Sequence, residues 1–293
     1  DFDDGGEWPK RNFDLALDGD LTLKAADGAE STLTLTVVDS QNSGGGSTNE
    51  VGELAFYSSS ADQRATFTLE KGVTIDTNAK IWFGRPTQSS SSDTTPTDIV
   101  VNGNIIQQAH DGRYYGILQI QTEKDSTVLV NGSVAFGWTL SVRGAVFTVS
   151  STGEVKASDP ASTSSTILVD ARSGVGGKFI VDGSKAVSAV VLDVDELGSF
   201  EMKNEAAAAF DTVDLAKNAT LLVADGSTLT ADAVTNAGTI QITGENGKLA
   251  VAEGGLTNKG AIVFGASDKT VNTTFDVGML SKKAGSSAFN FQN

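Results

Sequence analysis

One phrase of the sequence occurs twice at a fixed interval, and this repetition limits the possible folds more than any other feature. VTNAGTIQI at residues 234–242 is answered by LTNKGAIVF at residues 256–264, 22 positions later. Each copy has a Thr-Asn-x-Gly turn followed by alternating apolar residues, a pattern typical of a short strand buried on one side. A fixed period of this size indicates stacked supersecondary units. It is too short for the four strands of a propeller blade but fits one coil of a parallel β-solenoid.

Apolar triplets that precede a polar turn extend this pattern through the chain. They lie at residues 21–23, 67–69, 99–101, 128–130, 147–149, 179–181, 200–202, 221–223, 240–242 and 262–264. From residue 103 the turn residues fall at intervals of 29, 21, 30, 21, 22, 21 and 21. Hairpins of a β-meander would place similar strands about 8–12 residues apart, so the longer interval favours parallel coils. We therefore expect an all-β fold, a single-stranded parallel β-helix solenoid of about eleven coils with inserted loops.

The period also predicts the domain organisation. We expect one β-helix domain over residues 1–293, with loops inserted near 39–50, 85–98, 107–113 and 156–166, where the intervals lengthen. Residues 1–13 and 282–293 are the candidate caps, because the open ends of a strand stack need covering. The alanine-rich segment 205–210 is interpreted as an outward loop or a bent strand. Stacking would also place Asn236 over Asn258, where two side-chain amides can hydrogen-bond between coils.

Composition and charge exclude several classes of function. Of the 293 residues, 21 are Lys or Arg and 37 are Asp or Glu, giving a net charge of −16, which repels nucleic acid and anionic membranes. The chain has no cysteine, hence no disulfide, thiolate metal site or thiol nucleophile. It also lacks an apolar run of about 18 residues, so we expect no direct membrane insertion. The acidic first residues suggest the cut end of a mature or trimmed product, and we expect no cofactor and no bound metal.

The Thr-Asn-x-Gly-x-Ile phrase, the coil of 21 to 22 residues, the polar bias and the acidic charge together resemble passenger domains of bacterial autotransporters and filamentous-haemagglutinin-like surface adhesins. The resemblance covers roughly residues 14–281, as a style of repeat. It implies a right-handed β-helix, secreted to the surface of a Gram-negative cell. It also implies adhesion or self-association, with a host surface protein, a glycan or a second copy of the chain as partner.

Catalytic groups are sparse in this sequence. The single histidine, His110, stands beside Asp111 in an inserted loop, where a general base held by a carboxylate is weighed against a solvated side chain. Asp193 and Asp195 are expected on one outward face, with Asp214 in the next coil. That group suits a solvated acidic face first, calcium second, and the paired acids of a glycosidase third.

Trp82, Arg113, Tyr114 and Arg143 form the one candidate binding site. Counted from the preceding turn glycine, they stand at +10, +10, +11 and +11 in three consecutive coils. Equal phase predicts one face, where aromatic rings can stack on sugars and guanidinium groups can bind carboxylates. The plainer alternative is that the aromatic residues form an inward core ladder while the arginines balance acidic neighbours.

Two functions therefore stay open at the level of sequence. The first is a non-catalytic extracellular surface module for adhesion to host or glycan ligands, for self-association, or for both. The alternative is a carbohydrate-active enzyme, a polysaccharide lyase or glycosidase, on the same scaffold. Catalysis needs titratable groups that converge, so we expect a binding module and no enzyme.

Overall fold

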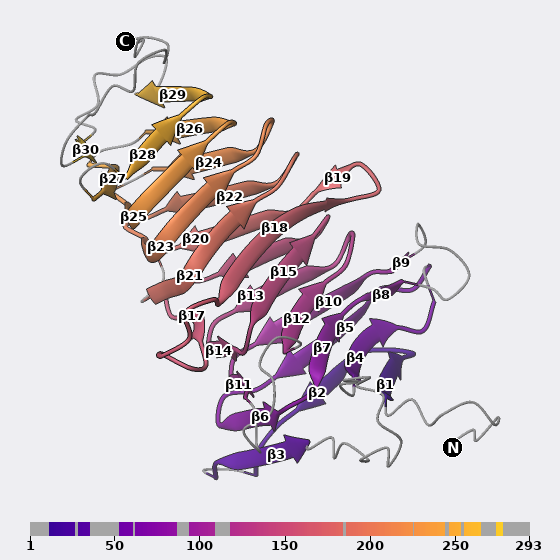
Figure 1. Ribbon diagram of the computed structural model, residues 1–293. Coiled ribbons are helices and arrows are strands. Elements are labelled where there is room, and N and C mark those ends of the chain that lie inside the picture. Colours follow the sequence, from indigo (N-terminus) through magenta and orange to yellow (C-terminus); the bar gives the residue numbers. More distant parts are fainter. Residues whose placement is uncertain are drawn as a thin grey trace, which may run out of the picture.

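The protein is a stack of parallel β-strands, seen in a computed structural model (Figure 1). The structure describes residues 12–26, 29–35, 53–60, 62–86, 94–108, 118–183, 186–224, 226–243, 246–252, 255–264 and 274–277. Within these residues, pairings between strands of successive coils are parallel, and the chain returns to the same strand positions again and again. The parallel β-helix expected from the period is confirmed, and the β-meander is excluded.

One side of the stack is a ten-stranded parallel sheet. All ten apolar triplets of the sequence lie in it, and they pair in the expected register, Phe147 with Phe179, Phe179 with Phe200 and Phe200 with Leu221. Its strands are β2 (Leu21–Leu23), β5 (Ala65–Leu69), β10 (Thr97–Val101), β13 (Thr127–Val130), β16 (Val146–Val149), β20 (Lys178–Asp182), β22 (Ser199–Lys203), β24 (Thr220–Val223), β26 (Thr239–Ile242) and β29 (Ala261–Phe264). The expected total of about eleven coils stays a prediction.

Two further strand positions complete each coil. The first follows the ten-stranded sheet along the chain and holds β3 (Ser31–Leu35), β6 (Val73–Thr77), β11 (Asn104–Gln107), β14 (Ser133–Phe136), β17 (Glu154–Ala157), β27 (Lys248–Val251) and β30 (Thr274–Val277). The second, called here the third stack, holds β1 (Asn12–Leu17), β4 (Glu53–Ser58), β7 (Lys80–Phe83), β12 (Gln119–Thr122), β15 (Thr139–Arg143), β18 (Thr166–Arg172) and β28 (Leu256–Asn258). A coil is thus one pass through three strand positions.

In three coils the last two positions merge into one nine-residue strand. These strands are β21 (Ala186–Val194), β23 (Ala207–Leu215) and β25 (Thr228–Asn236). The first half of β21 pairs with β17 and its second half with β18. The alanine-rich segment 205–210 enters β23, whose pairing is interrupted at Asp211, so the interpretation as a bent strand is confirmed and the outward loop is wrong.

The core is a narrow column of apolar side chains from all three strand positions. Along the ten-stranded sheet the rings of Phe147, Phe179 and Phe200 stack with centroids 5.0 and 5.3 Å apart. Phe210 from β23 meets Phe200 edge-on at 5.8 Å. Phe147, Phe179 and Phe200 thus pack between successive coils, while Phe210 packs within the coil of Phe200, and the sequence period places like side chains above one another.

Turns between strands depend on glycine and on side-chain amides. A Cβ added to Gly132 would lie 1.9 Å from the carbonyl oxygen of Gly103 in the coil below, so no larger residue fits there. Asn131 donates to Asn102 over 2.9 Å beside these glycines. The expected bond between Asn236 and Asn258 is confirmed, with Nδ2 and Oδ1 2.7 Å apart.

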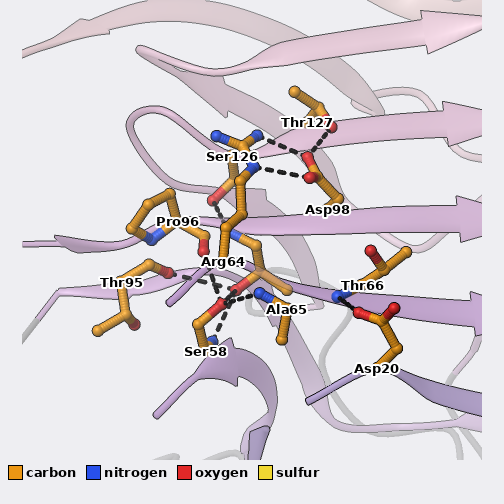
Figure 2. A network of polar contacts seen from close by, with 11 residues as sticks. Asp20, Ser58, Arg64, Ala65, Thr66, Thr95, Pro96, Asp98, Ser126 and Thr127 are labelled. Atoms are coloured by element: carbon orange, nitrogen blue, oxygen red, sulfur yellow. Dashed lines mark hydrogen bonds and ion pairs between the residues drawn. The ribbon is translucent and has the colours of Figure 1, made fainter. Parts of the chain in front are cut away.

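A polar network holds the corner where the chain returns from the loop predicted near residues 85–98 (Figure 2). The short strands β8 (Arg85–Pro86) and β9 (Thr94–Thr95) pair antiparallel, and Ser58 then donates its hydroxyl to Pro96 O over 2.7 Å. Arg64 donates to both oxygens of Asp98, and Thr127 from the next coil donates to the same carboxylate. The corner connects three successive strands of the ten-stranded sheet.

Candidate ligand-binding face

Trp82 lies on the outward face of the third stack. Its neighbours Ile81 and Phe83 point into the core and are fully buried, so the indole between them points out. Gln121 of β12 pairs with Trp82, and Ser141 of β15 pairs with Gln121. The inward aromatic ladder considered for Trp82 is therefore wrong.

Arg143 lies on the same outward face, one row further along the strands. Its guanidinium stands 3.4 Å from Asp170 Oδ2 on one side and 3.9 Å from Glu123 Oε1 on the other. The expectation that Trp82 and Arg143 share a face is confirmed. The plainer idea that the arginine balances acidic neighbours holds for Arg143 as well.

Glu123 forms the centre of this face although its side chain is fully buried. Gln121 donates to its Oε1 over 2.5 Å, and Arg172, at the end of β18, approaches its Oε2 to 3.6 Å. Gly84 on the preceding coil has a φ of +74°, and a Cβ there would collide with Ser126 Oγ. Trp82, Gln121, Glu123, Ser141, Arg143 and Arg172 are called here the outer polar cluster.

Burial dominates the electrostatics of this cluster. It raises the pKa of Glu123, because a buried carboxylate loses its hydration, and Arg172 and Arg143 oppose that rise. Lys80 places its ammonium 3.9 Å from the centroid of the Trp82 ring. Burial also lowers the pKa of Lys80.

Arg113 and Tyr114 lie outside the residues that the structure describes, and so does His110 with Asp111. The equal-phase argument is wrong for this coil, because strand β12 supplies the pairing partner of Trp82 and that partner is Gln121. Strand β12 starts only at Gln119 in this coil, so a count of +10 or +11 from Gly103 stops short of it. A role for Arg113 or Tyr114 in binding stays a prediction.

The acidic group around Asp193 lies in the expected place. Leu192 and Val194 are buried, so Asp193 and Asp195 point outward, and Asp193 pairs in register with Asp214. Burial raises the pKa of Asp193, and the neighbouring acids Asp195 and Asp214 add to the rise. Among the described residues no group of three or more histidine, aspartate or glutamate side chains has a geometry suited to a metal ion.

Glu123, Gln121, Ser141 and Arg172 were not found from the sequence. The signal that could have found Glu123 is a charge alternation in register, because Glu123, Arg143 and Asp170 follow one another in successive coils at one strand position. Inserted loops of different length separate these residues along the chain. The alternation becomes visible only after the loops are removed from the count.

We expect the stability of the protein to fall with rising pH through Glu123. Because its folded pKa lies above the ordinary pKa of a glutamate, the folded state binds more protons than the unfolded state between the two pKa values, and stability declines until the folded pKa is passed. The slope is at most about 1.4 kcal/mol per pH unit. Urea unfolding midpoints of wild type and Glu123→Gln, compared at each pH from 4 to 8, measure the contribution of Glu123 to this pH dependence.

Asp98→Asn is the matched control with the opposite sign. The hydrogen bond from Arg64 lowers the pKa of Asp98, so this carboxylate stabilises the fold above its unfolded pKa and loses that effect as the pH falls. The difference between wild type and Asp98→Asn should therefore grow with pH through the acid range. A wild-type advantage over Glu123→Gln that grows with pH would contradict the assignment for Glu123.

No protein-family model matches the chain, and no curated protein or solved structure matches it. Among the residues that the structure describes, no helix has the length and apolarity needed to cross a membrane.

Proposed function

We propose that this protein is a non-catalytic module of a bacterial cell surface that adheres to a glycan or host surface ligand through the outer polar cluster. The observation that carries the proposal is the position of Trp82 and Arg143 on one outward face of a regular stack. The resemblance of the repeats to autotransporter passenger domains supports the location outside the cell. A stiff stack suits adhesion because it holds its outer side chains in fixed positions.

Self-association is the second arm of this proposal. One outward row of the ten-stranded sheet contains Val100 and Leu129, then Thr148, Ile180 and Glu201, and Val146 stands two residues before Thr148 on the same face. Leu129 is 36% exposed and Val146 38%. Exposed apolar side chains that lie close together on a sheet, here Leu129 and Val146, favour contact with another protein surface, here a second copy. Light scattering against protein concentration tests this arm, which is abandoned if the mass stays that of one chain.

The enzyme alternative also has an observation in its favour. Glu123 and Asp170 flank Arg143, and two carboxylates beside a basic residue are the minimum set of a sugar-cleaving site. A general acid must touch the oxygen that it protonates. Glu123 is fully buried and held by Gln121 and two arginines, so adhesion is the function that this geometry supports better.

Trp82→Ala should weaken glycan binding about tenfold or more without unfolding the protein. Buried faces of tryptophan are frequent energetic centres of binding sites, while the outward indole contributes little to the core. The measurement is a glycan and matrix-protein array, run with calcium and with chelator, followed by titration of any ligand found. Released product in any well would favour the enzyme instead.

Trp138→Ala is the matched control. Trp138 is half-buried and stands just before β15, at the opposite end from Arg143, so the same loss of an indole occurs away from the cluster. Binding should survive this change. Equal losses for the two variants, or no loss for Trp82→Ala, would remove the cluster as the binding site.

A further inference from the structure

The outward face of the ten-stranded sheet has an apolar centre. Leu129 of β13 and Val146 of β16 are exposed on neighbouring strands, and the residues next to each of them along the chain are buried in the core. One strand further out on either side stand Val100 of β10 and Ile180 of β20, both half-buried and both outward. Exposed apolar side chains grouped in this way mark contact surfaces for other proteins.

An ion pair stands on each side of this centre. On the side of β10, Arg64 donates to both oxygens of Asp98 (Figure 2). On the side of β20, Lys178 Nζ lies 2.5 Å from Glu201 Oε2. The side chains of Asp98 and Lys178 are 33% and 42% exposed, so both can contact a second protein surface.

Two rows of outward side chains cross the four central strands in register. The first row is Asp98, Thr127, Val146 and Lys178, and the second is Val100, Leu129, Thr148 and Ile180. Asp98 and Lys178 are therefore equally far from the midline between β13 and β16, and so are the two ends of the second row. A two-fold axis along that midline would bring each end of a row opposite the other end in a second copy.

We propose that two copies of the chain pack these faces together about that two-fold axis, so that their stacks run in opposite directions. This inference rests on the self-association arm of the proposed function and names its surface and orientation. Asp98 then faces Lys178 of the second copy. In the other row Val100 faces Ile180. Because the axis repeats every contact, the first row supplies two ion pairs around the apolar centre.

The charges across this contact alternate in sign. Arg64 is followed by Asp98, and Asp98 by Lys178 of the second copy. Lys178 in turn holds its own Glu201. Each charge thus has opposite charges as its neighbours when the two faces lose water, which offsets the cost of desolvation.

A two-fold axis along the stack would fit these rows poorly. Each strand would then face itself in reverse, and the two rows would exchange places. Asp98 would lie against Val100 of the second copy. Lys178 would lie against Ile180, and apolar side chains offer no partner to either charge. The order of the side chains therefore favours stacks that run in opposite directions.

The overlap of the two faces is small. The axis sets β2 against β24 of the second copy, so the eight strands from β2 to β24 take part on each copy, and β26 and β29 lie beyond the overlap. At about 4.8 Å per strand and about 14 Å of strand length, each copy contributes roughly 500 Å², or about 1,000 Å² in total. This area is near the lower limit for a specific interface, so we expect a weak and reversible dimer.

Two single variants test the orientation by complementation. Lys178→Glu sets a second acid opposite Asp98, and Asp98→Lys sets a second base opposite Lys178, so each variant alone should associate about tenfold or more weakly than wild type. In an equimolar mixture the new glutamate faces the new lysine, and the unchanged Asp98 faces the unchanged Lys178. Most of the lost affinity should then return. Sedimentation of the whole chain over a range of concentrations measures each sample.

Leu129→Gln tests the apolar centre, and Val263→Gln is the matched control. Val263 is an outward residue of β29 that is 40% exposed, against 36% for Leu129, and it lies beyond the overlap. Leu129→Gln should weaken association about tenfold, because the dimer contains the change twice. Val263→Gln should leave association unchanged.

Each result decides a different question. A chain that stays monomeric overturns this inference together with the self-association arm, while the glycan array still decides on adhesion. Association that neither Lys178→Glu nor Leu129→Gln weakens overturns this inference and leaves self-association through another face. Weakening without recovery in the mixture overturns the two-fold axis proposed here.

Cysteine variants decide the orientation if Asp98→Lys fails to fold by circular dichroism. The chain has no cysteine, so each new thiol is the only one in its molecule. Val100→Cys and Ile180→Cys should cross-link with each other through a short thiol-specific reagent, and neither should cross-link with itself. Cross-linking of either variant with itself would overturn the proposed axis.

Discussion

Replacing Phe179 by alanine should lower the free energy of unfolding by roughly 3–5 kcal/mol, as for other large core aromatic residues. The ring is fully buried and stacks on Phe147 at 5.0 Å and on Phe200 at 5.3 Å. Because each coil packs only on its two neighbours, the cavity cannot be filled from elsewhere in the core. Chemical denaturation followed by circular dichroism measures the loss.

Ile180→Ala is the control for this change. Ile180 is the next residue of β20 but points outward and is half-buried, so it should lose much less. Hydrogen exchange adds a spatial test, because amides of β16, β20 and β22 should lose protection before those of β2. Similar losses for Phe179→Ala and Ile180→Ala would contradict the description of the core as a stacked column.

Asn236→Ala should cost roughly 2–4 kcal/mol through unpaired buried groups. The fully buried amide of Asn236 donates to Asn258 Oδ1 over 2.7 Å and to Ala261 O over 3.0 Å, and its oxygen accepts from Gly238 N. Alanine would leave the buried N–H group of Gly238 without a partner, while Asn258 and Ala261, whose bonds are only partly buried, can regain water in part. Thermal or urea unfolding measures the change.

Asn218→Ala is the control, because it removes an exposed side-chain amide in a turn, whereas Asn236→Ala removes a buried one. Asn218 also bridges two coils, through a 2.9 Å bond to Glu196, but both residues are exposed and water can replace the bond. Asn218 also has a φ of 67°, where alanine is strained, so the loss should be about 1 kcal/mol and come mainly from the backbone. An equal loss of unfolding free energy for Asn236→Ala and Asn218→Ala would mean that burial does not strengthen the side-chain amide bonds between coils.

The fold could be predicted from the sequence because its period is carried by the core itself. Phe147, Phe179 and Phe200 repeat one apolar triplet, and parallel stacking requires like side chains at one depth in each coil. The turn glycines recur for a similar local reason, since Gly132 lies against Gly103. The apolar triplets and the turn glycines stay recognisable when loops are inserted elsewhere, because each is read within or next to its own strand and not from a count along the chain.

The candidate site could be predicted only in part. Trp82 and Arg143 were placed on one face, because short connections join their strands to the preceding turns. Gln121 and Glu123 follow an inserted loop, so a count along the chain misses the strand on which they lie. The burial of Glu123 depends on side chains from three coils, and a linear pattern does not contain that information.

The nearly regular spacing from β20 to β29 has a consequence for how such a chain can change. Paired residues are 21 positions apart between β20 and β22 and between β22 and β24, 19 between β24 and β26, and 22 between β26 and β29. If a segment of one coil were duplicated or deleted, the strands on either side would still pair with similar strands, because successive coils have similar stacking surfaces. The reach of the molecule is therefore adjustable in steps of about 4.8 Å, one coil at a time. Recombination between repeats can then set how far the N-terminal coils stand from the C-terminal ones without redesigning any contact.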